Sequence, residues 1–250
     1  MAAPDFTGRV ALVTGGSGSI GGGVAEALRA HGARVVAADL HGKGAAAGAE
    51  GVRPLDVTDK AAVGALVEAV EREFGGVDIL VNAAGVVSFG DAHGLAEAEW
   101  DRVIDINLKG SFLACQAVMG TMKRRGYGRI VNVGSVVGKN GGNARPWLDP
   151  AEQRIAGNVA YGVSKAGVHA MTAFLAKELA ASGVTVNAVA PGPIATAMTT
   201  AFPATLRALI PAGRMGTVDD VARAVLFLAA EEAGFISGEI LDINGGMWCD

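Results

Sequence analysis

Arg9-Val-Ala-Leu-Val-Thr14 leads directly into Thr14-Gly-Gly-Ser-Gly-Ser-Ile-Gly21, and a helical pattern begins at once. The first run is almost continuously apolar and rich in valine, which is typical of a strand that is buried on both faces of a sheet. Glycines in the turn that follows allow a tight bend and a close approach of the backbone to another group. The segment therefore predicts a strand, a glycine-rich turn and a helix, which together form the first part of a βαβ unit.

The same alternation continues along the chain. Further β-rich runs occupy 34–38, 51–55 (the weakest), 77–81, 129–133, 184–190 and 239–243, and stretches with helical spacing occupy 20–31, 59–74, 97–125, 160–181 and 218–230. Strands that alternate with helices form right-handed βαβ units. We therefore expect an α/β fold of the Rossmann type, a doubly wound and mostly parallel sheet of seven strands with helices on both faces. No repeat or linker divides the chain, so 1–250 is expected to form a single domain.

Composition narrows the class of protein. Of the 250 residues 50% are apolar and 18% charged, with a net charge of −4, which predicts a large packed core. No apolar run reaches the roughly 18 residues of a membrane helix, and no signal peptide or basic block is visible. We expect a cytoplasmic protein without a membrane or nucleic-acid partner. Cys115 and Cys249 predict two reduced thiols, and the four histidines lack the spacing of metal ligands.

The glycine-rich turn and the end of the next β-rich run predict a dinucleotide site. Backbone N–H groups of the turn and of the helix after it would bind a pyrophosphate. The residues expected there are Gly15, Ser17, Ser19, Ile20 and Gly21. Asp39 ends the next run, where its carboxylate can accept hydrogen bonds from both ribose hydroxyls and repel a 2′-phosphate. This predicts NAD rather than NADP; a plain β–α turn and a solvated acid are the alternatives.

Tyr161 and Lys165 form a candidate acid–base pair. They lie at i and i+4 of a predicted helix, so their side chains share one face. A free phenol has a pKa near 10, and a neighbouring ammonium is expected to lower it toward neutrality. Most such pairs are only a solvated helix face. Next to a dinucleotide site, however, the pair predicts removal of a hydroxyl proton during hydride transfer.

These motifs resemble the short-chain dehydrogenase/reductase family, in its 250-residue subtype, over essentially the whole chain. In family order the matching motifs are Thr14-Gly…Ile20-Gly21, Asp56-Val57, Asn82-Ala-Ala-Gly85, Asn107, Ser135, Tyr161-x-x-x-Lys165, Pro191-Gly-Pro-Ile194 with Thr196, and Asn244-Gly-Gly246. The resemblance implies that Tyr161 is the general acid/base, that Lys165 binds the nicotinamide ribose, and that Ser135 binds the substrate oxygen. It also implies that Asn107 anchors a water in the proton relay.

The resemblance assigns the remaining cofactor contacts in order along the chain. It implies that Asp56 and Val57 contact the adenine. The riboses would meet Asn82, Ala83, Ala84 and Gly85, and the carboxamide region would meet Pro191, Gly192, Ile194 and Thr196. It further implies a homotetramer or a homodimer, with a small-molecule substrate.

Two departures from the family pattern stand out. Ser19 occupies a position where the family usually has glycine. Ser135 and Tyr161 are 26 positions apart (161 − 135) rather than about a dozen, because an irregular loop at 138–158 is inserted between them. We expect this insertion, with Trp147 and Leu148, to wall the substrate pocket, and a lid at 196–213 to add Phe202. A solvent loop or an oligomer contact is the alternative for the insertion.

Together these features predict an NAD-dependent oxidoreductase of class EC 1.1.1.- that interconverts a secondary alcohol and a ketone, in the oxidative direction. An alternative is an NAD(P)H-dependent 3-oxoacyl-thioester reductase, since Gly213-Arg-Met-Gly216 and the end of the chain look most like such enzymes. A remote alternative is a non-enzymatic NAD-binding regulator, which would be expected to lose the acid–base set.

Overall fold

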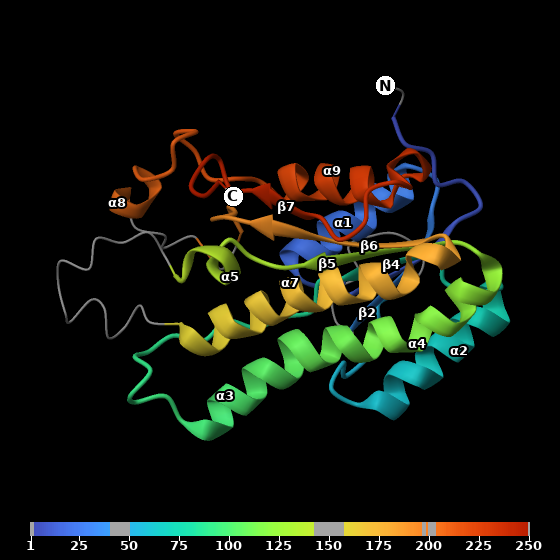
Figure 1. Cartoon of the computed structure of the whole chain (residues 1–250), viewed down its shortest axis with the longest axis horizontal. Helices are drawn as coiled ribbons and strands as arrows, with labels where there is room; N and C mark the ends of the chain where they lie inside the picture. The colour runs from blue at the N-terminus through green and yellow to red at the C-terminus, as the bar shows by residue number, and fades with distance from the viewer. Residues whose placement is uncertain (1–2, 41–50, 143–157, 197–198, 200–203, 250) are drawn as a thin grey trace.

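The computed structural model describes residues 3–40, 51–142, 158–196, 199 and 204–249, and its elements alternate as predicted (Figure 1). The strands are β1 (Val10–Thr14), β2 (Arg34–Asp39), β3 (Arg53–Pro54), β4 (Ile79–Asn82), β5 (Gly128–Val133), β6 (Val184–Pro191) and β7 (Ile240–Ile243). The longer helices are α1 (Ser19–Ala30), α2 (Lys60–Phe74), α3 (Glu97–Ile104), α4 (Gly110–Arg125), α7 (Val159–Leu179) and α9 (Val218–Ala229). Short helical segments are α5 (Val137–Asn140), α8 (Ala204–Arg207), η1 (Asp105–Lys109), η2 (Ala180–Ser182) and η4 (Glu231–Ala233).

The strands form one parallel sheet with the order β3-β2-β1-β4-β5-β6-β7. From β1 the chain moves outward to β2 and β3, then returns to place β4 on the other side of β1. The crevice at the carboxyl ends of strands beside such a reversal is where doubly wound folds bind their ligands. The predicted fold class is confirmed, and the topology places the crevice at the ends of β1 and β4.

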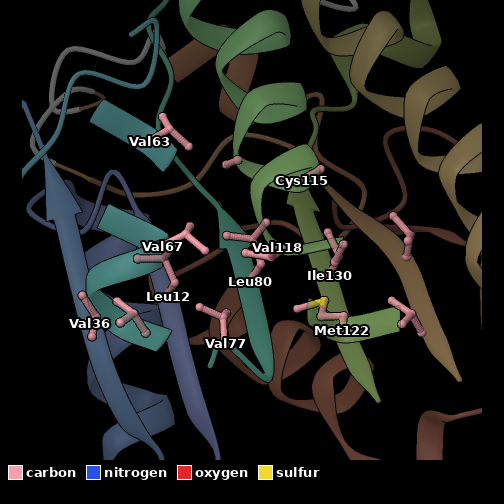
Figure 2. Packing of buried hydrophobic residues seen from close by; sticks show 14 of the residues in the cluster. Leu12, Val36, Val63, Val67, Val77, Leu80, Cys115, Val118, Met122 and Ile130 are labelled. Carbon is pink, nitrogen blue, oxygen red and sulfur yellow. The ribbon is translucent and has the colours of Figure 1, made fainter. Parts of the chain in front are cut away.

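Helices cover both faces of the sheet (Figure 1). On one face α1 and α9 pack through residues such as Val24 and Val225, and on the other α2, α4 and α7 pack through residues such as Val67 and Leu179. Figure 2 shows the second layer, in which valine and leucine side chains of the strands meet those of the helices. Cys115 is fully buried in this layer, and burial raises the pKa of its thiol to about 12.

The long helix predicted over 97–125 is interrupted once. Its middle, η1, is a π-helical turn between α3 and α4. A π turn adds one residue to the helix and shifts the side chains that follow, and such turns are frequent at functional sites. Here the turn contains Asn107, which is fully buried. Within the described part of the chain, none of the helices has both the length and the apolarity that a membrane crossing requires.

Candidate active site

The glycine-rich turn between β1 and α1 is closely packed against two other segments. Gly15 has a φ of +68°, and a Cβ there would lie 2.6 Å from the backbone nitrogen of Ala84. A Cβ at Gly21 would lie 2.2 Å from the carbonyl oxygen of Gly15. Only glycine fits at either position. Ser19, in contrast, is exposed as the first residue of α1, so its side chain fits where the family usually has glycine.

This turn fits the cofactor that the sequence predicts. The absence of side chains at Gly15 and Gly21 keeps the turn tight against the start of α1. In turns of this kind the backbone N–H groups at the helix N-terminus bind a pyrophosphate. Ser17 and Ser19 are exposed on the same turn. Gly15, Ser17, Ser19, Ile20 and Gly21 are therefore the residues that would hold the phosphates.

Asp39 lies beside this turn. It ends β2, and its carboxylate oxygen Oδ2 accepts a hydrogen bond from the backbone N–H of Ser17 at 3.1 Å. The carboxylate is thus oriented at the carboxyl end of the sheet, next to the turn. Asp56 follows β3 at the same edge, where hydrogen bonds from the hydroxyl and the N–H of Thr58 lower the pKa of its carboxyl. Val57 is buried against Gly110, where a Cβ would lie 2.7 Å away.

The segment after β4 reaches the turn from the other side. The N–H of Ala84 donates to the hydroxyl of Thr14 at 3.3 Å, and that of Ala83 to the carbonyl oxygen of Thr14 at 3.2 Å. The Asn82 side chain is buried and donates to Asn132 Oδ1 at 2.9 Å, inside the protein. The backbone of Ala83 and Ala84 is therefore held against the end of β1, and the Asn82 side chain lies in the interior.

Asn107 links this segment to the helix that carries the acid–base pair. Its Oδ1 accepts from the N–H of Val86 at 2.8 Å, and its Nδ2 donates to the oxygen of Val86 at 2.9 Å and to Ser164 Oγ at 3.0 Å. The Ser164 hydroxyl in turn donates to the carbonyl oxygen of Tyr161 at 2.7 Å. Gly85 lies next to both Asn107 and Lys165. A Cβ at Gly85 would be 3.3 Å from Asn107 Oδ1 and 3.5 Å from Lys165 Nζ. The π turn thus brings Asn107 against both neighbours.

Ser135, Tyr161 and Lys165 come together at the end of β5 and the start of α7. Lys165 is buried, and its Nζ donates to the carbonyl oxygen of Val133 at 2.7 Å. The same Nζ lies 5.8 Å from the centre of the Tyr161 ring. Ser135 is buried directly after β5, and its hydroxyl oxygen accepts from the N–H of Val137 at 3.2 Å. The three side chains that the sequence analysis singled out therefore share one site.

The predicted lowering of the Tyr161 pKa is wrong. Burial raises the pKa of the phenol, and a hydrogen bond with Ser135 opposes this only in part. Burial also lowers the pKa of Lys165 to about 8. The ammonium is therefore costly to keep charged in this site, and it donates to Val133 rather than to the phenol.

The Lys165 pKa makes a prediction about stability. Between its ordinary value of 10.5 and about 8 the unfolded chain holds a proton that the folded chain has released, so stability rises with pH in this window. Relative to a Lys165→Met variant, the wild type is expected to gain about 3 kcal/mol between pH 8 and pH 10.5. Urea unfolding of both proteins at several pH values measures the difference. Parallel stability curves would contradict it.

The segment after β6 is anchored by other loops. A Cβ at Gly192 would lie 3.0 Å from the Cα of Asn244, and Ile194 is buried against the layer formed by α1 and α9. Thr196 donates its N–H to the hydroxyl of Thr199, which donates to the oxygen of Ile194 at 2.7 Å. The Ile194 side chain belongs to the core. The four residues predicted to meet the carboxamide, Pro191, Gly192, Ile194 and Thr196, therefore remain candidates through their backbone or, for Thr196, its hydroxyl.

The predicted substrate contacts Trp147, Leu148 and Phe202 lie outside the described residues, as do most of the 138–158 insertion and part of the 196–213 lid. The beginning of the insertion is helical as α5, where Lys139 Nζ donates to Asp242 Oδ2 at 2.9 Å and to the oxygen of Ile240 at 3.1 Å. The insertion is thus tied to β7 where it leaves the site.

One hydrogen bond of the site could not be predicted from the sequence. His169 Nε2 accepts a hydrogen bond from the backbone N–H of Ser135 at 3.3 Å. The two residues are far apart in the sequence, and a single histidine within a helix has no recognisable spacing. Among the described residues, no group of three or more His, Cys, Asp or Glu side chains is placed to hold a metal ion.

Comparison with known proteins agrees with this geometry. Residues 15–248 match the family model described as enoyl-(acyl carrier protein) reductase. The chain is 41% identical to 3-oxoacyl-[acyl-carrier-protein] reductase of Escherichia coli (strain K12), covering 98% of this chain and 99% of the relative. It is 40% identical to the BbsD subunit of (2S)-[(R)-hydroxy(phenyl)methyl]succinyl-CoA dehydrogenase of Thauera aromatica, covering 95% and 96%.

The fold is also found in solved structures. The crystal structure of gox2181 superposes with a TM-score of 0.84 and 34% identity, covering 97% of this chain and 96% of that one. The similarity in sequence and the similarity in fold therefore agree with each other. The chain belongs to the short-chain dehydrogenase/reductase family, whose members are oxidoreductases that use a nicotinamide cofactor.

Proposed function

We propose that this protein interconverts a 3-hydroxyacyl thioester and the corresponding 3-oxoacyl thioester, with NAD(H) as the cofactor. The chemistry is supported by the grouping of Ser135, Tyr161 and Lys165 at the carboxyl edge of the sheet, beside the glycine-rich turn. The substrate class is supported by the names of two relatives, a 3-oxoacyl-[acyl-carrier-protein] reductase and a subunit of (2S)-[(R)-hydroxy(phenyl)methyl]succinyl-CoA dehydrogenase. Both names contain an acyl thioester or acyl-carrier substrate. These names favour the thioester alternative over the broader secondary-alcohol reading.

Each side chain has a defined part in this proposal. When bound, the nicotinamide supplies the hydride acceptor for oxidation or the hydride donor for reduction. Tyr161 takes the hydroxyl proton in oxidation and returns it to the oxygen in reduction. Ser135 donates a hydrogen bond to the same oxygen, and Lys165 binds the nicotinamide ribose. The Asn107 side chain holds the backbone at Val86. We further propose that Asn107 anchors a water in the proton relay.

Initial rates test the substrate class. Activity is followed by NADH absorbance with 3-hydroxybutyryl-CoA, acetoacetyl-CoA, cyclohexanol and a hydroxysteroid. We expect kcat/KM for the thioester to exceed that of any simple alcohol by at least about tenfold, because a site built for the thioester gains binding energy from it. An equal or higher value for a simple alcohol would favour the broader reading. Cofactor binding without turnover of any substrate would instead favour the non-enzymatic regulator.

Asp39 is the residue that we propose favours NAD over NADP. Its carboxylate, oriented by Ser17, can accept hydrogen bonds from the adenosine ribose and would repel a 2′-phosphate. In an Asp39→Ala variant the ratio of kcat/KM with NADP to that with NAD is expected to rise at least about tenfold, which corresponds to about 1.4 kcal/mol. Glu68→Gln removes an exposed negative charge from α2, away from the turn, and should leave the ratio unchanged. No change in the Asp39 variant would contradict the assignment.

Exposed aromatic residues support a homo-oligomer, for which we propose a homotetramer or a homodimer. Phe112 of α4 is 40% exposed and Phe174 of α7 is 78% exposed, and these helices lie side by side (Figure 1). On the other face of the sheet Phe227 of α9 and the nearby Phe235 are also exposed. Two separate apolar surfaces favour a tetramer, because each can form its own symmetric contact. Light scattering in solution measures the mass.

A further inference from the structure

His169 contacts the backbone that carries Ser135. Its Nε2 accepts the Ser135 N–H at 3.3 Å. A Cβ at Gly134 would lie 2.1 Å from Nε2, and a Cβ at Gly138 would lie 3.0 Å from the ring carbon Cε1. The imidazole therefore packs against glycines on both sides of the serine. A larger residue at Gly134 would displace the ring, and one at Gly138 would first meet the α7 backbone, at 2.7 Å from the nitrogen of Ala166.

The hydrogen bonds of the neighbouring residues show why a side chain is needed here. The N–H groups directly before and after Ser135 donate to carbonyl oxygens of β6, at 2.8 and 3.0 Å. Successive N–H groups of an extended chain point to opposite sides, so the Ser135 N–H points toward the side of β4. The pairing of β4 with β5 ends at Asn132. His169 thus supplies the acceptor that a longer β4 would have supplied.

His169 belongs to the same helix face as the acid–base pair. Tyr161, Lys165 and His169 lie at i, i+4 and i+8 of α7. One helix therefore carries the phenol and also binds the backbone of the serine that must meet the same substrate oxygen. An acceptor at Nε2 requires the neutral ring with its proton on Nδ1.

We propose that His169 is a positioning residue for Ser135. It fixes the backbone at the end of β5, so that the Ser135 hydroxyl is held at a constant distance from Tyr161. The inference rests on the proposed function, in which Ser135 binds the substrate oxygen. Its consequence is that His169 acts on kcat through Ser135, and has little influence on cofactor binding.

Two variants separate the hydrogen bond from packing. His169→Leu has a comparable volume and no acceptor, and kcat is expected to fall about 10- to 100-fold, the loss typical of a misplaced group. His169→Gln offers a side-chain carbonyl oxygen and is expected to recover most of that loss. The Kd for NADH, measured by fluorescence, should remain within about twofold in both. Equal loss in the two variants, or a loss mainly in Kd, would overturn the proposal.

A double-mutant cycle with Ser135→Ala gives the decisive result. If His169 acts through Ser135, adding His169→Leu to the Ser135→Ala variant should lower kcat by at most about a further threefold. If the double variant instead loses the product of the two single-variant losses in kcat, His169 has a general structural role and the inference is overturned. An unchanged kcat in Ser135→Ala alone would instead refute the serine assignment, and with it the basis of the inference. If His169→Leu folds poorly, the unbranched and adaptable His169→Met replaces it in the cycle.

Discussion

Replacing Tyr161 by Phe is expected to lower kcat about a thousandfold while the Kd for NADH changes by less than about twofold. The substitution removes only the hydroxyl that, in the proposed function, exchanges a proton with the substrate oxygen, and the ring remains. Steady-state rates in both directions measure kcat, and fluorescence titration with NADH measures Kd. Undiminished turnover in this variant would refute the acid–base assignment.

The chain contains a matched control for this substitution. Its other tyrosine, Tyr127, lies between the guanidinium groups of Arg9 and Arg129, at 3.8 and 4.5 Å from its ring centre. Tyr127→Phe removes the same atom and leaves those contacts in place, so kcat is expected to stay within about twofold of the wild type. A thousandfold difference between the two Phe variants would locate the effect at Tyr161.

The raised pKa of Tyr161 adds a dependence on pH. Oxidation needs the phenolate, whereas reduction needs the neutral phenol. Because burial holds the pKa above its ordinary value of 10.0, the phenol is protonated at neutral pH. The oxidation rate at saturating substrate is therefore expected to rise as pH is increased from 7 to 10, and the reduction rate is not. The opposite order would contradict the proposed direction of proton transfer.

Gly21→Ala is expected to weaken NADH binding by about a hundredfold and to destabilise the protein by about 3 kcal/mol. The new methyl group would lie 2.2 Å from the carbonyl oxygen of Gly15, which cannot withdraw because Gly15 itself packs against the backbone of Ala84. Moving the turn would also move the N–H groups that we propose bind phosphate. Calorimetric titration and urea unfolding measure the two effects.

Gly64→Ala is the control for this substitution. Gly64 is in the interior of α2, and beyond its chain neighbours and the adjacent backbone of α2 no atom lies within 4 Å of the position that its Cβ would occupy. Because alanine has the higher helix propensity, the variant is expected to be more stable by up to about 1 kcal/mol, with unchanged cofactor binding. Equal losses in the two alanine variants would show that the Gly15–Gly21 contact has no special role.

The elements of the sheet could be predicted because their runs of valine, isoleucine and alanine are nearly continuous, as in the run 184–190 that becomes β6. Even the weak run 51–55 contains a strand, β3. The proximity of Tyr161 and Lys165 could be predicted because a fixed helical spacing links them. The π turn at Asn107 was not, since a single added residue leaves the apolar periodicity of a long helix almost unchanged.

Two properties of the site depend on contacts between distant segments, which explains why sequence reasoning missed them. The pKa of Tyr161 is decided by how deeply the phenol is buried, and spacing within one helix contains no information on burial. The bond from Ser135 to His169 depends on β5 extending beyond β4, so it follows from the lengths of two strands rather than from a motif.

The buried thiol of Cys115 offers a direct measure of how often the native protein opens. With no exposed surface and a pKa of about 12, this sulfur cannot react with an alkylating reagent while the layer between the sheet and α4 is closed. In a Cys249→Ser variant, which removes the exposed cysteine, the labelling rate then reports the transient opening of the core. Saturating NADH should slow that labelling in proportion to its binding to the closed state, so one thiol would monitor both breathing of the core and occupancy of the crevice.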